Sequence, residues 1–355
     1  MKVDTVLGPI SPDSLGITLP HEHVFIDLSS FRLIKPEEGS LKFLVDAPVR
    51  MENLGVLRKN PLVSRDNLKL DDVHVAEKEL LDFAKCNGKS VVDMSVIGMG
   101  RNPLGLREVS KETGVNILAS TGWYRVESHP SYVKDKSIED LKEIMVKELK
   151  EGIGDTGVRA GVIKCACTQP APFHPQEKKV LQAAAQAQSE THAGLTVHPT
   201  LTAVPNMPLP TVAEAYLDVY EKEGGDPKKF YLSHSGNTLF DRDYHKRLLE
   251  RGITLVFEFG SVAYGGIGIL YYGGIKVPSE LDKIRAVVEL CRIGYDKQIM
   301  LSHDVCMKIM LKKYGGYGYS HVLESVVPIL EIEGVTKKQI RNMLVENPKR
   351  ILQKP

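Results

Sequence analysis

Short apolar runs alternate with amphipathic stretches along most of the chain. The runs are rich in β-branched residues, which predicts buried strands. They lie near residues 16–22, 90–95, 116–121, 159–165, 194–198, 229–234, 252–258 and 298–303. Between them, apolar residues recur at three- and four-residue spacing, as in VAEKELLDFAKCNG and SELDKIRAVVELCRIG. This spacing predicts helices, several of which end at Gly.

Eight strands that alternate with helices predict parallel strands joined by right-handed crossovers. That count and the length of 355 residues suit a single (β/α)8 TIM barrel over residues 1–355. A doubly wound open sheet is the alternative, but it needs a Gly-rich turn after the first strand, where LPHEHVFID stands instead. Residues from about 28 to 73 fit neither pattern and are expected to form a long first βα loop. The Gly-rich residues 260–277 are expected to form a mobile loop.

Side chains that can bind metal ions stand at the C-terminal ends of the predicted strands. They are His21 and His23 at the first strand, Lys164 at the fourth, His198 at the fifth, His234 at the sixth and Asp304 after the eighth. In a barrel these ends converge on one mouth, and imidazoles that meet a carboxylate in a cleft suit a metal. His21 and His23 are two residues apart, so on a strand both can reach one ion. The alternative is a pair of exposed loop histidines.

Lys164 lies in the apolar run AGVIKCAC. Burial lowers the pKa of a lysine, and a neutral amine can react with carbon dioxide to give a carbamate. Such a carbamate would be an anionic ligand bridging two cations; the alternative is a lysine that reaches solvent or pairs with a carboxylate. His303 should point away from Asp304 and is assigned no ligand role. Structural or solvated roles are expected for His74, His129, His174, His192, His245 and His321.

Composition narrows the function classes. Lys and Arg total 46 against 45 Asp and Glu, so the net charge of +1 argues against a nucleic-acid partner. The five Cys form no disulfide framework or zinc-finger spacing, which favours packing roles in a reducing cytoplasm. The chain has no apolar run of about 18 residues, so no membrane association is expected. Nucleophile-elbow, P-loop and Rossmann motifs are absent, which argues against acyl-enzyme, nucleotide and nicotinamide chemistry.

The motifs TLPHEHVF, AGVIKCA, VHPT, LSHSGNT, IMLSHDV and ENPKRIL, in this order, resemble the phosphotriesterase family of the amidohydrolase superfamily. RKNPLVSRDNLKL and KKYGGYGYSHVL are most similar to its phosphotriesterase-related branch. The resemblance implies two divalent ions, with zinc expected first and manganese, cobalt or iron also compatible. It places His21, His23 and Asp304 on the more buried ion, His198 and His234 on the more exposed ion, and a carbamate on Lys164 between them. It also implies a homodimer.

The expected activity is hydrolysis of a small-molecule carboxylic ester, lactone or amide. A hydroxide held between the two ions would attack the carbonyl while Asp304 takes up the proton. For substrate contacts, Tyr124 matches a lactonase tyrosine, Trp123 precedes it, and Glu258 stands near the place of a lactonase arginine. The alternatives are phosphotriesterase activity on organophosphates and a non-catalytic metal-binding barrel. A phosphorylated substrate would need a basic cluster, which Lys308, Lys312 and Lys313 could supply. The favoured interpretation of these three lysines is a solvated face of a helix.

Overall fold

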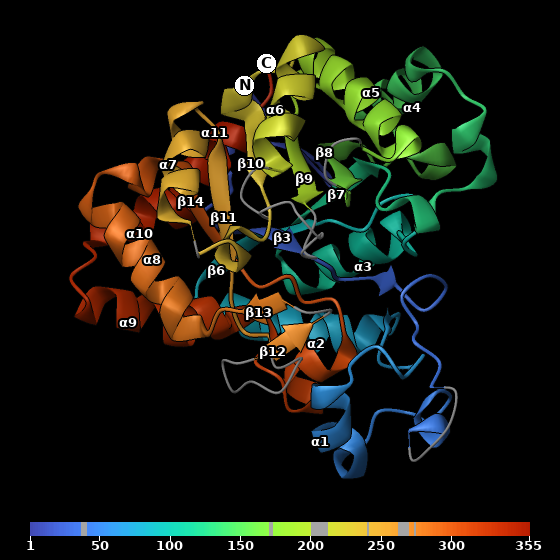
Figure 1. Cartoon of the computed structure of the whole chain (residues 1–355), viewed down its shortest axis with the longest axis vertical. Helices are drawn as coiled ribbons and strands as arrows, with labels where there is room; N and C mark the ends of the chain where they lie inside the picture. The colour runs from blue at the N-terminus through green and yellow to red at the C-terminus, as the bar shows by residue number, and fades with distance from the viewer. Residues whose placement is uncertain (37–40, 170–172, 200–211, 240, 262–269, 273–274) are drawn as a thin grey trace.

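The computed structural model describes residues 1–355 except 37–40, 170–172, 200–211, 240, 262–269 and 273–274. Within the described residues, eight parallel strands form a nearly closed barrel surrounded by helices, which confirms the predicted fold (Figure 1). In order around the barrel the strands are β3 (Ile17–Glu22), β6 (Gly88–Asp93), β7 (Asn116–Gly122), β8 (Ala160–Cys167), β9 (Gly194–Pro199), β10 (Phe230–Leu232), β11 (Thr254–Glu258) and β14 (Ile299–Ser302). All eight overlap the ranges predicted from hydrophobic patterning.

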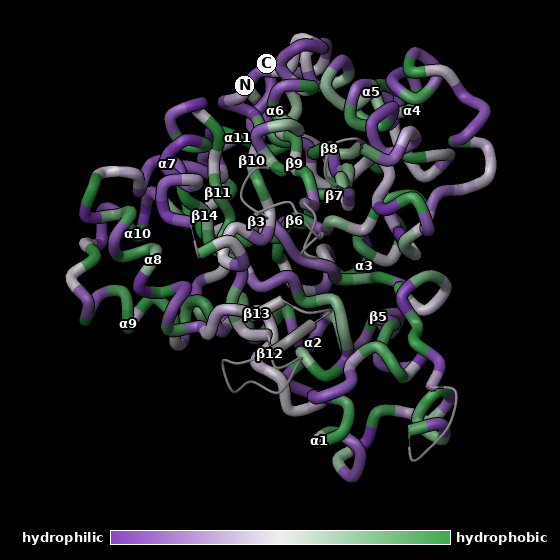
Figure 2. The backbone as a smooth tube through the Cα atoms, viewed as in Figure 1, coloured by the Kyte–Doolittle hydropathy of each residue, from purple (hydrophilic) through white to green (hydrophobic). Residues whose placement is uncertain are grey.

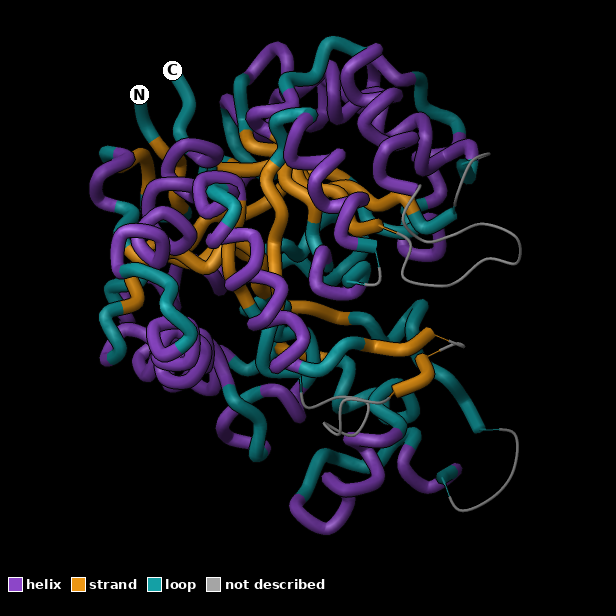
Figure 3. The backbone as a smooth tube through the Cα atoms, turned by 60° about the vertical axis from the view of Figure 1, so that its left-hand side comes forward, coloured by secondary structure: helices purple, strands orange, loops and turns teal. Residues whose placement is uncertain are grey.

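Helices follow the strands and enclose them (Figure 3). They are α1 (Met51–Lys59), α2 (Val73–Lys85), α3 (Pro103–Thr113), α4 (Ile138–Lys150), α5 (Pro175–Thr191), α6 (Val212–Lys222), α7 (Arg242–Glu250), α8 (Glu280–Arg292), α9 (Val327–Ile332), α10 (Lys337–Arg341) and α11 (Asn347–Leu352). Side-chain caps fix several starts: Asp72, Ser137 and Ser279 each accept a backbone N–H from the first turn of α2, α4 and α8. Among the described residues, none of these helices combines the length and apolarity needed to cross a bilayer.

Two segments predicted as loops contain regular structure. The first βα connection holds α1 and a short antiparallel pair between β4 (Ile26–Asp27) and β5 (Lys69–Leu70). The hydrophobic pattern missed α1 because it has a single buried residue, Leu57. In the Gly-rich segment, β12 (Leu270–Tyr272) pairs with β13 (Ile275–Val277), whereas the rest of the predicted mobile loop at 262–269 and 273–274 lies outside the described residues.

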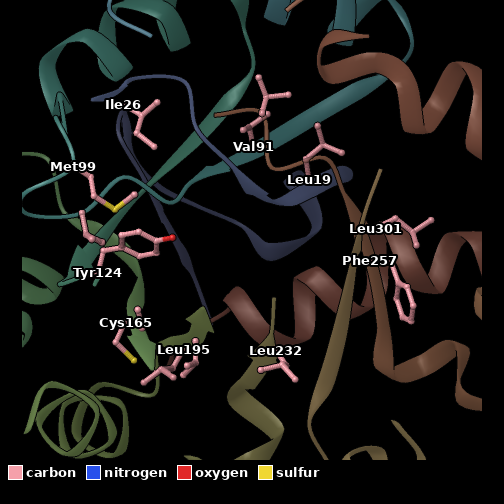
Figure 4. Packing of buried hydrophobic residues seen from close by; sticks show 14 of the residues in the cluster. Leu19, Ile26, Val91, Met99, Tyr124, Cys165, Leu195, Leu232, Phe257 and Leu301 are labelled. Atoms are coloured by element: carbon pink, nitrogen blue, oxygen red, sulfur yellow. The ribbon is translucent and has the colours of Figure 1, made fainter. Parts of the chain in front are cut away.

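One apolar layer lies between the barrel strands and the helices. Figure 2 shows hydrophobic stretches along the central strands and hydrophilic ones at the periphery. Buried side chains from successive strands fill this layer (Figure 4): Leu19, Val91, Cys165, Leu195, Leu232, Phe257 and Leu301. Burial of these faces fixes which side of each strand is left to line the barrel interior.

A second apolar cluster fills the lower interior of the barrel. Val162 and Val256 belong to it, and each stands two residues before a polar residue of the mouth, Lys164 and Glu258. Val3, from the N-terminal hairpin of β1 (Val3–Thr5) and β2 (Gly8–Ile10), is fully buried in this cluster and closes the end opposite the mouth. Because side chains alternate along a strand, the same face is apolar below and polar above.

Candidate active site

All six predicted metal ligands gather at the C-terminal mouth of the barrel. Three lie on strands, with His21 on β3, Lys164 on β8 and His198 on β9. His23 follows β3, His234 follows β10, and Asp304 follows β14. The five basic side chains are buried, and Asp304 keeps 24% of its side chain exposed. The mouth is therefore open to solvent at the carboxylate.

His21, His23 and Asp304 form a first group. Asp304 Oδ1 lies 3.5 Å from His21 Nε2 and 3.3 Å from His23 Nε2. One ligand atom from each of the three lies within 4.8 Å of the others. Two imidazole nitrogens and one carboxylate oxygen at this spacing fit a divalent transition-metal ion such as zinc.

Hydrogen bonds on the far side of each ring orient these histidines. His21 Nδ1 lies 3.1 Å from Glu258 Oε1, and His23 Nδ1 lies 2.8 Å from Ser95 Oγ. A partner at Nδ1 leaves Nε2 free to act as a ligand. The sequence did not single out Ser95, although it is the last residue of the second predicted strand.

Lys164 lies beside the first group. Its Nζ lies 2.9 Å from His21 Nε2, and the side chain is almost fully buried. Burial lowers the lysine pKa to about 8, although the Asp304 and Glu258 carboxylates oppose this shift. The neighbouring strand approaches so closely that a Cβ on Gly122 would stand 2.2 Å from the Lys164 carbonyl oxygen, so only glycine fits there.

His198 and His234 form the second half of the site. His198 Nδ1 lies 2.7 Å from His234 Nε2, and His198 Nε2 lies 3.1 Å from the Tyr124 hydroxyl. Burial, reinforced by neighbouring cationic groups, holds the pKa of His198 well below its usual range. Burial likewise lowers the pKa of His234 to about 4. Both rings are therefore neutral at neutral pH, which is the form that binds a metal.

Glu258 supports His234 as well as His21. The backbone of His234 has a left-handed φ of 59°, and its N–H donates to both carboxylate oxygens of Glu258, at 2.9 and 3.0 Å. Burial raises the Glu258 pKa to about 8. One ligand atom each from Glu258, His21 and His234 also lie within 4.8 Å of one another. The contact between Glu258 and substrate stays a prediction, because the carboxylate of Glu258 is engaged by His21 and His234.

Two residues beside the site face elsewhere. Trp123 is fully buried, and its indole N–H donates to the Tyr132 hydroxyl at 3.3 Å, so its predicted contact with substrate stays a prediction. His303 points away from Asp304, as predicted. Its Nδ1 lies 2.8 Å from Glu22, and its Nε2 accepts the backbone N–H of Val322.

The three lysines weighed as a phosphate-binding cluster each have an acidic partner. Lys308 pairs with Asp66 at 2.6 Å, Lys312 pairs with Glu324 at 3.0 Å, and Lys313 lies 3.9 Å from Asp72. Their charges are thus offset locally. These ion pairs favour the solvated face over a phosphate-binding cluster. The expected helix is absent at these positions, because Lys308, Lys312 and Lys313 lie in short 3-10 turns.

This chain is similar to known proteins along nearly its whole length. The model of the Phosphotriesterase family matches residues 1–352. The N-acetyltaurine hydrolase of Xenopus tropicalis is 33% identical over 99% of this chain and 97% of its own length. A resiniferatoxin-binding protein from Rhodobacter sphaeroides superposes with a TM-score of 0.89 at 34% identity, covering 99% of this chain and 95% of its own. The phosphotriesterase homology protein of Escherichia coli, complexed with phosphate in its active site, gives 0.76 at 26% identity, covering 96% and 100%. This chain therefore belongs to the phosphotriesterase family of hydrolases.

Proposed function

We propose that this protein is a two-metal hydrolase that cleaves the amide bond of small N-acyl amines. The observation that carries the proposal is the convergence of His21, His23, Lys164, His198, His234 and Asp304 on one barrel mouth. The amide is preferred among carbonyl substrates because a relative that matches nearly the whole chain is named N-acetyltaurine hydrolase. Lactones and carboxylic esters, which react at the same kind of carbonyl, come next.

The side chains would form two sets of ligands, one for each of two divalent ions. His21 and His23, with Nε2 turned toward Asp304 Oδ1, would hold one ion, and His198 with His234 would hold the other. Lys164, carbamylated, would add an anionic ligand between these histidine pairs. Divalent ions held there would polarise a carbonyl group and lower the pKa of bound water.

Asp304 and Tyr124 act on the reacting groups. Asp304 Oδ1 faces the first histidine pair, while Oδ2 lies toward His234 Nδ1 at 3.9 Å. One oxygen can thus serve as a ligand while the other accepts a proton from the attacking water. Burial raises the pKa of the Tyr124 hydroxyl, so it stays protonated and can donate a hydrogen bond to substrate at the rim.

A substrate panel tests the proposal. Protein loaded with zinc, manganese or cobalt should hydrolyse N-acetyltaurine or another N-acyl amino acid faster than γ-lactones, aryl esters or an organophosphate triester. Activity should disappear on chelation and return on adding metal. Preference for lactones would correct the substrate class, and organophosphate hydrolysis as the fastest reaction would favour the phosphotriesterase alternative. Tight metal binding without hydrolysis of any member would indicate a metal-binding barrel.

The pKa of Lys164 makes its carbamylation depend on pH. Only the neutral amine reacts with carbon dioxide, and with a pKa of about 8 its neutral fraction falls about tenfold for each pH unit below that value. In metal-free protein given isotope-labelled bicarbonate, the carbamate signal in carbon NMR should therefore rise steeply from about pH 6 to pH 8. A signal that is flat over this range, or unchanged in Lys164→Ala, would assign the carbamate to another amine.

A further inference from the structure

Glu22 is the middle residue of the HEH motif, and its side chain is directed away from the two ligand histidines on either side. It is fully buried, and its carboxylate meets the segment that leads into Asp304. Oε1 accepts the backbone N–H of His303 at 2.8 Å, and Oε2 accepts that of Val305 at 3.0 Å. A single carboxylate therefore binds the peptide N–H groups immediately before and after Asp304.

These bonds fall where the barrel closes. β3 and β14 stand at the two ends of the strand order. The described bonds between them include Asp304 N–H to the His21 carbonyl at 3.1 Å and His21 N–H to Ser302 Oγ at 3.1 Å. Ser302 Oγ also lies 2.8 Å from Glu22 Oε1. The position of Asp304 relative to His21 thus depends on Glu22 and its partners at this seam.

The backbone conformation of Asp304 needs support from these hydrogen bonds. Its φ is 60°, a left-handed value that is unfavourable for a residue with a Cβ. Such a conformation persists when the surrounding structure holds it. Asp304 has an exposed fraction of 24%, so apolar packing does not hold its carboxylate on every side. The bonds from Glu22 to both flanking peptides are suited to doing so.

We propose that Glu22 is a positioning residue that holds the Asp304 carboxylate in register with His21 and His23. It acts through the backbone of the Asp304 turn and touches neither ion nor substrate. The proposal rests on the proposed function, because a working role for Asp304 gives this register its importance. It concerns β3 and β14 alone, whereas Glu258 performs a comparable task for the His234 turn.

Glu22→Gln tests the proposal, with Glu79→Gln as the matched control. Glu79 is also a buried carboxylate that accepts two backbone N–H groups, those of Lys312 and Lys313, at 3.0 and 2.9 Å. Glutamine keeps the size, but it loses the charge and turns an NH2 group toward a donor. We expect Glu22→Gln to weaken binding of one zinc ion about tenfold or more in chelator competition, the scale for loss of a supporting partner. kcat should fall by a similar factor at nearly constant KM, whereas Glu79→Gln should keep wild-type values.

Combination with Asp304→Asn separates positioning from general stability. If Glu22 acts through Asp304, adding Glu22→Gln to Asp304→Asn should change kcat less than about twofold, because interacting residues are not additive. The proposal would be overturned if the losses of kcat from the two single substitutions multiplied in the double variant. It would also be overturned if Glu22→Gln had the same metal affinity and kcat as Glu79→Gln. If Glu22→Gln does not fold, Ser302→Ala, which removes one contact of the carboxylate, undergoes the same comparisons. If no substrate is hydrolysed, the proposed function fails, while the chelator competition still decides the role of Glu22.

Discussion

Lys164→Ala is expected to lower kcat/KM by at least about 10²-fold, the upper end of what losing a supporting metal partner costs. Lys164 Nζ stands 2.9 Å from His21 Nε2, and the side chain is almost fully buried. Alanine removes the amine that is proposed to become the carbamate. The two proposed ions would then lose their shared anionic ligand, and their mutual repulsion would be less offset.

Partial rescue distinguishes this role from simple packing. A short carboxylic acid such as acetate or propionate can occupy the space left by the side chain and supply two oxygens. Added to Lys164→Ala, it should restore part of kcat and of the second metal equivalent, measured by elemental analysis. Lys229 is the matched control, because burial lowers its pKa to about 8 as well, while its Nζ binds backbone carbonyls of the C-terminal segment. Lys229→Ala should keep its kcat and show no response to the acid.

The barrel and the mouth could be predicted because both follow from local patterns. Apolar runs of strand length end in polar residues at one end only, and parallel strands bring those ends together. Val162 followed by Lys164 illustrates the principle: alternation puts both inside the barrel, one in the apolar interior and one at the site. The helix α1 was not predicted, because only Leu57 among its nine residues is buried and the helix therefore has no buried apolar stripe.

The supporting contacts could not be predicted, since they depend on backbone turns and on how the barrel closes. His234 and Asp304 both have positive φ, which residue type alone does not indicate. Only in those turns does the N–H of His234 face Glu258, and do the N–H groups on either side of Asp304 face Glu22. Likewise, Ser95 becomes relevant once β3 and β6 are in register and its hydroxyl meets His23. Strand ends thus predict the candidate ligands that gather at the mouth, while the hydrogen-bond partners of these residues require the three-dimensional structure.

Asp304→Asn is expected to lower kcat by about 10²-fold or more, the scale of general acid–base catalysis. Burial raises the pKa of Asp304, but the hydrogen bond to His23 and the electrostatic influence of the neighbouring His and Lys side chains outweigh burial and hold the pKa below its usual value. The carboxylate is therefore ionised over the working pH range and able to accept a proton. Asparagine keeps the shape and one ligand oxygen but is almost without basicity. Metal content should survive in part, and KM should change little if Tyr124 and the surrounding loops bind the substrate.

Asp296→Asn provides the matched control for this substitution. Asp296 is a buried aspartate before β14, and its Oδ2 accepts from Asn342 at 2.6 Å, away from the proposed metal ligands. Its asparagine variant should keep kcat and change only the free energy of unfolding, by about 1 kcal/mol for one altered hydrogen bond. The decisive measurement is kcat together with metal content per chain. Asp304→Asn with two bound ions and nearly full kcat would remove the proposed proton acceptor, leaving Asp304 as a ligand alone.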